Sequence, residues 1–305
     1  MKQAALLLAL LAPPALAAPA SAKDDPLTRP ITTSYTDRWM QPRAPIPIYG
    51  KVWMTGSVHL NTAVIDTGAG LVVIDAGLPQ FEPQLKAQIR SLGHKPSDVR
   101  YILVTEAHFD HAGGVAALAR DTGATVIASP YTVAALRKGQ TGVEDPQNGD
   151  LKPFPAPTRL RAIRDGGQIK LGDTVITARF TPGHTAGSTS WTWRSCAPKA
   201  GAKPECRAMV FMASLSATAA DTYRFSASEH AAVVASFRQS FAKARAFACD
   251  YLITGHPEHG QTDDKVAAAM RAPGSVNWED KGACAATVAR FEDRLNTTLA
   301  REAAK

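Results

Sequence analysis

The sequence of 305 residues lacks the features of two large protein classes. After its first residues, no stretch is long and apolar enough to span a membrane. The Lys and Arg residues behind the formal net charge of +7 are scattered, with no basic block and no interleaving with aromatic residues. We therefore expect neither a membrane-spanning protein nor a nucleic-acid-binding protein, and the charge indicates solubility.

The first 22 residues have the pattern of a secretory signal peptide. A basic start is followed by an apolar run from Ala4 to Ala12, and small residues allow cleavage after Ala17 or Ala22. The run is too short to span a bilayer and Pro13-Pro14 interrupts it, which argues against a membrane anchor. We expect export to a bacterial periplasm and a mature chain, residues 23–305, that forms one domain of about 280 residues.

Cysteine is scarce, with four residues, and no two of them have the two-residue separation of a zinc knuckle. Four cysteines in an exported chain indicate two disulfides, with three pairings open. Pairing Cys196 with Cys206 would close a turn-rich insert, and pairing Cys249 with Cys284 would tie a late strand to the C-terminal helix. We predict these two disulfides rather than zinc-bound thiolates.

The run from Thr105 to Gly114 carries four side chains able to bind a metal: Glu106, His108, Asp110 and His111. Because residues two apart on an extended segment project from the same face, Glu106 and His108 can reach one ion together. Asp110 and His111 follow where the chain turns, and can reach a second ion. Imidazole and carboxylate groups are suitable zinc ligands, so this density predicts a metal site rather than a polar surface loop.

Two further histidines, His184 and His256, lie at the ends of predicted strands in turns rich in glycine and proline. The glycine before each one lets the backbone bend and direct the imidazole into a shared cavity. Either histidine alone would be an ordinary structural or surface residue, but the first cluster makes both candidate ligands. The other four histidines have no such context and are interpreted as ordinary residues: His59, His94, His230 and His259.

The hydrophobic pattern predicts strands at 52–54, 62–66, 71–75, 101–104, 125–128, 169–171, 174–180, 189–193, 208–212 and 251–254. It predicts helices at 81–92, 115–120, 130–138, 228–246 and about 283–302, and a loop at 140–157. Each half of the chain thus has strands followed by helices, without a short-period repeat. This order predicts an α/β fold, an αββα sandwich of two mixed sheets covered by helices on both outer faces.

Taken together, these motifs resemble the metallo-β-lactamase superfamily, whose signature is His-x-His-x-Asp-His, then a Gly-His strand end and a final histidine. Residues 72–78 and 181–188 are similar to two further segments of that pattern. Subclass B3 fits best, through the signal peptide, the Trp- and Pro-rich N-terminal arm, the late cysteine pair and Ser214-Leu215-Ser216. The resemblance covers essentially the mature chain and implies the αββα fold.

The resemblance implies two zinc ions. Glu106, His108 and His184 would hold the first, and Asp110, His111 and His256 would hold the second. The family usually has histidine at the position of Glu106. A carboxylate adds negative charge there, which should weaken the pull of the ion on bound water and raise the pKa of that water.

The resemblance also implies an activity: zinc-dependent hydrolysis of the β-lactam ring of antibiotics by a metal-bound hydroxide, which confers resistance. Asp110 would orient the hydroxide as well as bind metal. Ser214 and Ser216 would donate hydrogen bonds to the substrate carboxylate, with simple loop capping as the alternative. The protein would act as a monomer on a small molecule, without nucleic acid and without a membrane once the signal is removed.

Other hydrolases of the same fold, such as thioesterases, lactonases and phosphodiesterases, are the nearest alternative. They usually place a bridging aspartate after the strand that corresponds to 209–212, where this chain has no carboxylate until Asp221. A weakly active zinc-binding periplasmic protein is a second alternative, which the glutamate at position 106 keeps open. A serine-based mechanism is disfavoured because the chain has no Gly-x-Ser-x-Gly elbow and no Ser-x-x-Lys element in suitable context.

Overall fold

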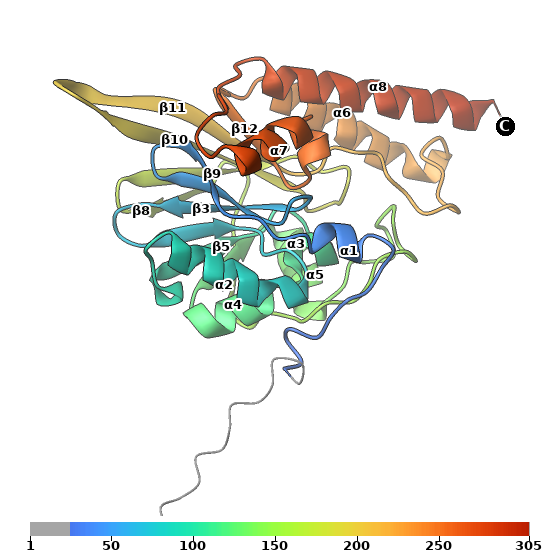
Figure 1. Ribbon diagram of the computed structural model, residues 1–305. Coiled ribbons are helices and arrows are strands. Elements are labelled where there is room, and N and C mark those ends of the chain that lie inside the picture. Colours follow the sequence, from blue (N-terminus) through green and yellow to red (C-terminus); the bar gives the residue numbers. More distant parts are fainter. Residues whose placement is uncertain (1–24, 305) are drawn as a thin grey trace, which may run out of the picture.

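Two β-sheets pack face to face in the computed structural model, which describes residues 25–304, and helices cover both outer faces (Figure 1). This is the αββα sandwich that the sequence predicts. The predicted signal peptide, with cleavage after Ala17 or Ala22, lies outside the described residues. Within residues 25–304, no helix combines the length and the apolar character needed to cross a bilayer.

The first sheet contains seven of the strands described, in chain order: β1 (Ile46–Tyr49), β2 (Val52–Gly56), β3 (Asn61–Asp66), β4 (Leu71–Ile74), β5 (Val99–Leu103), β6 (Thr125–Ala128) and β7 (Leu160–Ala162). Strands β1 to β4 pair antiparallel, whereas β4 to β7 pair parallel. The second sheet has the order β12-β11-β10-β9-β8, from the strands β8 (Gln168–Leu171), β9 (Thr174–Phe180), β10 (Thr189–Lys199), β11 (Ala202–Met212) and β12 (Tyr251–Thr254). Only β11 and β12 pair parallel in it.

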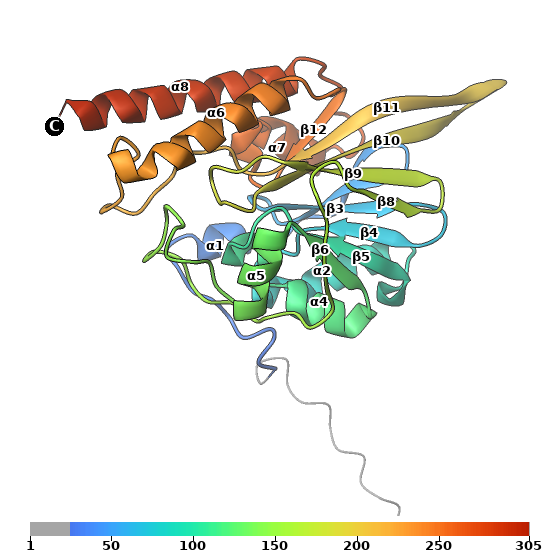
Figure 2. The ribbon, with the colours of Figure 1, turned by 180° about the vertical axis from the view of Figure 1, so that it is seen from behind.

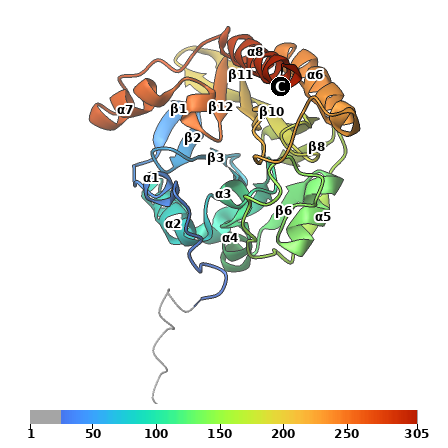
Figure 3. The same ribbon diagram turned by 90° about the vertical axis from the view of Figure 1, so that its right-hand side faces the viewer.

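Helices lie on opposite sides of the sandwich, as the end-on view in Figure 3 shows. The first sheet is covered by α2 (Glu82–Ser91), α4 (Val115–Thr122) and α5 (Pro130–Lys138). The second sheet is covered by α6 (Ala231–Arg245) and α8 (Ala283–Ala303), whereas α7 (Asp263–Arg271) lies near β1 and packs Val266 and Ala269 into the layer between the sheets. Short helices α1 (Thr36–Trp39) and α3 (Phe109–Ala112) complete the set, together with the 3₁₀ turns η1 (Pro79–Phe81), η2 (Pro96–Asp98), η3 (Ser228–His230) and η4 (Pro257–His259).

The core consists of three apolar layers, because both faces of each sheet are covered. In β4, Val72 and Ile74 face the layer between the sheets, while the alternate residues Leu71 and Val73 face the helices. Successive side chains of a strand point to opposite faces, so a strand buried on both faces has a continuous apolar sequence. The run Leu-Val-Val-Ile of β4, all fully buried, is of this kind.

The topology gathers the strand ends that carry chemistry at one edge of the sandwich. Strands β4, β5 and β6 are parallel, so the segments that follow them leave the first sheet at the same edge. In the second sheet β9, β11 and β12 run in one direction, so the segments after them also share an edge. Backbone hydrogen bonds join these edges, among them those from Thr189 N to Thr105 O at 2.8 Å and from Asn61 N to Gly255 O at 2.7 Å.

The sequence predictions for β6, α5, β9 and β12 match the structure residue for residue. The sequence did not indicate α1, β1, α3, β7 or α7, of which all but α7 have three or four residues. The segment between Cys196 and Cys206 differs from the expected turn-rich insert, because β10 and β11 continue through it as a projecting hairpin (Figures 1 and 2). Strand pairing extends that far since the two cysteines stand opposite each other in register.

Both disulfides expected from the sequence are present, Cys196–Cys206 in the hairpin and Cys249–Cys284 between the start of β12 and α8. Changing Cys249 and Cys284 to Ala is expected to lower the free energy of unfolding by about 3–4 kcal/mol, because the bond restrains a long loop of the unfolded chain. The cysteines of this pair lie 35 residues apart, against 10 for the hairpin pair. The matched removal of Cys196–Cys206 should therefore cost less, about 2–3 kcal/mol. Urea unfolding of the two double variants measures both values, and a larger loss from the hairpin pair would contradict this order.

Candidate metal centre

The segment that follows β5 is held in place by one buried carboxylate, that of Asp75. Its backbone has a φ of 58°, a left-handed conformation that non-glycine residues rarely adopt. Asp75 accepts hydrogen bonds from Thr105 N at 2.8 Å and Thr105 Oγ1 at 2.6 Å. Its Oδ2 also lies 3.0 Å from His111 Nδ1. Asp75 thereby holds both the start and the end of the 105–111 run, and sequence analysis gave it no role.

Six side chains converge beyond these strand ends in two groups of three: Glu106, His108 and His184, and Asp110, His111 and His256. In each group the candidate ligand atoms lie within 4.8 Å of one another. The members come from the segments after β5, β9 and β12, which the sequence separates by up to 150 residues, from 106 to 256. The structure thus brings together the six residues singled out from the sequence, in the same two groups.

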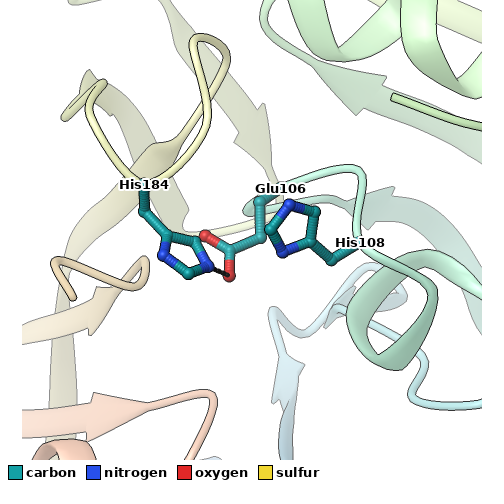
Figure 4. Close-up of side chains that lie close together, drawn as sticks. All are labelled: Glu106, His108 and His184. Atoms are coloured by element: carbon teal, nitrogen blue, oxygen red, sulfur yellow. Dashed lines mark ion pairs between the residues drawn. The ribbon is translucent and has the colours of Figure 1, made fainter. Parts of the chain in front are cut away.

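The first group is buried and centres on Glu106, whose side chain is fully inaccessible. Figure 4 shows His184 approaching Glu106 and His108 from a different segment of the chain. The Oε2 atom of Glu106 accepts hydrogen bonds from Ser188 Oγ at 3.3 Å and Ser214 N at 3.2 Å. Within residues 25–304 its Oε1 atom accepts no hydrogen bond, but it faces two imidazoles, with His111 Nε2 at 3.2 Å and His184 Nε2 at 3.6 Å. One oxygen is therefore anchored by the protein, and the other is left for a cation.

The second group lies directly beside the first. His111 Nε2 is 3.5 Å from Asp110 Oδ2 and 3.2 Å from Glu106 Oε1, so this imidazole borders both groups. His256 Nε2 is 3.1 Å from Asp110 Oδ2, and its side chain keeps 12% of its surface exposed. The ring of Trp39, from α1, lies 5.8 Å from that of His256. The second group is therefore the more accessible of the two.

Three of the four imidazoles form a hydrogen bond to an oxygen atom through the ring nitrogen that faces away from their group. His111 Nδ1 contacts Asp75, and His184 Nδ1 lies 2.8 Å from the carbonyl oxygen of Ser216. His108 Nε2 lies 3.0 Å from Asp145 Oδ2. Such contacts fix which nitrogen carries the proton and so which one is free to bind a metal. Asp145 lies in the 140–157 loop, where the sequence showed only residues typical of turns.

The charges within the groups are strongly coupled. Burial opposes ionisation of Glu106, but the imidazoles of His111, His184 and His108 outweigh it and lower the pKa of Glu106 to about 2. Burial likewise opposes ionisation of Asp110, whose pKa His111 and His256 hold well below its usual range. Burial would lower the pKa of His111, but Asp110, Glu106 and Asp75 raise it to about 10. The carboxylates are thus anionic and attract positive charge.

Two glycines allow the later histidines to approach the site. Gly183 has a φ of 145°, and a Cβ atom there would lie 2.6 Å from the ring of Phe237. A Cβ atom at Gly255 would lie 2.4 Å from His111 Cε1, so any side chain would displace that imidazole. The glycines predicted to direct His184 and His256 are therefore required by a backbone turn in one case and by close packing in the other.

The other sequence candidates lie at various distances from this centre. Ser214 and Ser216 are buried beside the first group, where Ser214 N holds Glu106 and the Ser216 carbonyl holds His184. The four histidines interpreted as ordinary, His59, His94, His230 and His259, belong to neither group. His259 comes nearest, with its ring 4.8 Å from that of His256.

The family model of the metallo-β-lactamase superfamily matches residues 56–196. A solved B3 metallo-β-lactamase described as having an active-site glutamic acid is 41% identical, over 92% of this chain and 98% of that one, with a TM-score of 0.82. The chain belongs to the metallo-β-lactamase superfamily. It is a metal-dependent hydrolase of that superfamily and groups with subclass B3 structures, as the sequence resemblance predicts.

Two further B3 structures have the same fold. An enzyme from a soil metagenome library is 40% identical, over 87% of this chain and 99% of that one, with a TM-score of 0.80. One from Bradyrhizobium japonicum is 30% identical, over 88% and 98%, with a TM-score of 0.75. A curated metal-dependent hydrolase of Anaeromyxobacter dehalogenans is 32% identical over 46% of this chain, and the match spans 45% of that protein. The chain thus spans less than half the length of the curated relatives that it matches.

Glu106→Gln is expected to lower the zinc affinity of the first group at least about tenfold, because a neutral amide replaces an anionic ligand. Glu106→His should retain or increase that affinity, since neutral imidazole is a good zinc ligand. Competition with a chromophoric chelator measures both. Glu82→Gln is the control, because Glu82 is an equally buried carboxylate that pairs with Lys86 at 3.0 Å. Wild-type zinc affinity in Glu106→Gln would contradict the role of Glu106.

Proposed function

We propose that this protein is a zinc-dependent β-lactamase that opens the β-lactam ring of antibiotics and so confers resistance. The observation that carries the proposal is the pair of adjacent groups, each with two imidazoles and one carboxylate, on a chain that aligns over 92% of its length with a B3 enzyme. We further propose that it acts as a monomer after export to the periplasm, a compartment in which its two disulfides would be stable.

The donor atoms fit two zinc ions. Zinc is bound in proteins by imidazole nitrogen and carboxylate oxygen, commonly with three protein ligands where the site is catalytic. Each group offers three such ligands. Glu106 Oε1 also supports the assignment, because within residues 25–304 this buried anionic oxygen accepts no hydrogen bond and faces His111 Nε2 and His184 Nε2, an arrangement that a shared cation would stabilise.

Bound zinc supplies Lewis acidity, which polarises a carbonyl and lowers the pKa of water from about 15.7 toward 7. The chain's own contribution is to position the reactants. The Asp110 carboxylate, kept ionised by its imidazole neighbours, accepts a hydrogen bond from the attacking water and directs it toward the lactam carbonyl. We infer that the substrate enters on the side of the second group, because the His256 side chain keeps 12% of its surface exposed.

Ser214 and Ser216 are proposed to donate hydrogen bonds to the carboxylate that β-lactams carry beside the ring nitrogen. Their place beside the first group supports this role. Ser216 has a second task, because its carbonyl and hydroxyl oxygens lie 2.8 and 3.2 Å from His184 Nδ1. Ser214 also has a second task, because its backbone N donates to Glu106 Oε2 at 3.2 Å and a side-chain hydrogen bond from it helps to lower the pKa of that carboxyl.

Lactone hydrolysis is the main alternative, because an N-acyl homoserine lactonase of Agrobacterium fabrum is 33% identical over 35% of this chain and 40% of its own length. The segment after β11 argues against it. Related hydrolases that are not β-lactamases usually carry a bridging aspartate there, whereas residues 213–220 contain no carboxylate and Asp221 is exposed. The proposal therefore favours a lactam over a lactone or a thioester.

The test compares rates on a cephalosporin, an acyl homoserine lactone and a thioester at a defined zinc concentration. We expect the cephalosporin to be the preferred substrate and chelation to abolish turnover. Asp110→Ala should lower kcat about 10²–10⁴-fold, the usual contribution of a positioned general base.

Asp221→Ala serves as the matched control, since it removes an exposed carboxylate from the segment after β11 and should leave kcat unchanged. Preference for the lactone or the thioester would refute the β-lactamase assignment. Full activity of Asp110→Ala would refute the role of Asp110, and activity that survives chelation would refute the dependence on metal.

A further inference from the structure

The segment 142–150 touches the first group and not the second. Its Asp145 contacts His108, and Gln147 Nε2 lies 3.4 Å from His184 Nε2. Its Pro146 carbonyl accepts a hydrogen bond from Ala220 N at 2.9 Å, which joins it to the segment that carries Ser214 and Ser216. Within residues 25–304, none of the hydrogen bonds or ion pairs of this segment reaches Asp110, His111 or His256. The segment 142–150 can therefore stabilise the ligands of the first group but not those of the second.

Asp145 is held in place by its own loop. Its Oδ1 accepts a hydrogen bond from Gln147 N at 2.9 Å, and its carbonyl accepts one from Asn148 N at 2.9 Å. Its backbone N donates to Gly142 O at 3.2 Å. These bonds leave only Oδ2 to face His108, and the residue keeps just 4% of its surface exposed. A carboxylate fixed in this way can orient the ring that it contacts.

The contact determines which nitrogen of His108 faces the first group. A neutral imidazole carries one N–H, and a carboxylate accepts that N–H rather than the bare nitrogen. With Nε2–H donating to Asp145, Nδ1 is the unprotonated nitrogen and is directed to the candidate metal site. In the second group Asp75 makes the corresponding contact with Nδ1 of His111, so that Nε2 faces the candidate ligands Glu106 and Asp110. Each group thus has one imidazole oriented by a buried aspartate.

We propose that Asp145 is a positioning residue for the first metal site, and that through it the segment 142–150 sets the affinity of that site without affecting the second. This rests on the proposed function only in taking the first group to bind zinc. Contacts of this kind to a ligating histidine contribute about 10–100-fold to metal affinity.

The test uses Asp145→Ala and Asp145→Asn in the full-length mature protein, with Asp150→Ala as control. Asp150 belongs to the same segment but is exposed and contacts neither group. Two quantities are measured: the tautomer of the neutral His108 ring in metal-free protein at alkaline pH, by long-range ¹H–¹⁵N NMR, and stepwise zinc affinity, by chelator competition. Neither uses a β-lactam, so failure of the substrate assignment would not affect them.

We expect Asp145→Ala to lose the Nε2–H preference of His108 and to weaken the first zinc about 10–100-fold, with the second zinc unchanged. Asp145→Asn should recover most of both, because its amide oxygen still accepts the Nε2–H. Asp150→Ala should match the wild type. An Asp145→Ala protein with unchanged tautomer and zinc affinity would overturn the proposal, as would equal weakening of both ions. If the wild type bound no zinc, the metal centre itself would be wrong, and the tautomer of His108 would still test Asp145.

Discussion

The centre of this molecule depends on one buried carboxylate, that of Glu106. One of its oxygens accepts hydrogen bonds, and the other accepts none within residues 25–304 and faces the imidazoles of His111 and His184. A buried polar atom without a partner costs about 1–3 kcal/mol, and more when it is charged. Four imidazoles and a second carboxylate are gathered around that oxygen and its neighbours. Charge neutrality then requires either protons on the imidazoles or bound cations. This requirement links the fold, the electrostatics and the proposed chemistry.

The surrounding structure orients three of these imidazoles through hydrogen bonds to the ring nitrogens that face away from the candidate metal site. Three different segments supply the acceptors, through Asp75 after β4, Asp145 in the 140–157 loop and the carbonyl of Ser216 after β11. Each acceptor takes one ring nitrogen and leaves the other for the site. The parallel strands place these segments at one edge, so that the ligands and their supports share one rigid base.

The glutamate at position 106 changes what the surrounding groups must supply. An imidazole ligand presents its second nitrogen as an N–H donor, whereas a carboxylate presents a second oxygen, which needs donors. Here Ser188 Oγ and Ser214 N both donate to Oε2 of Glu106. The site is thus consistent with a carboxylate ligand, and it does not resemble a histidine site with a damaged position.

The six candidate ligands could be predicted from the sequence because four occur within one short run and the other two follow glycines at strand ends. The fold class followed from the order of strands and helices. Asp145 could not be found, because an aspartate in a loop rich in Gly and Pro has the same sequence context whether it is buried or exposed. The length of the β10–β11 hairpin was missed for a related reason, since pairing between strands overrides local turn preference.

The most direct measurement is a crystal structure of the zinc-loaded protein with anomalous data at the zinc edge. We expect two zinc ions, each bound by two imidazoles and one carboxylate. Glu106 should bind through Oε1 while Ser188 and Ser214 keep Oε2. A first ion bound without Glu106, or a Glu106 side chain turned away from the metal, would contradict it.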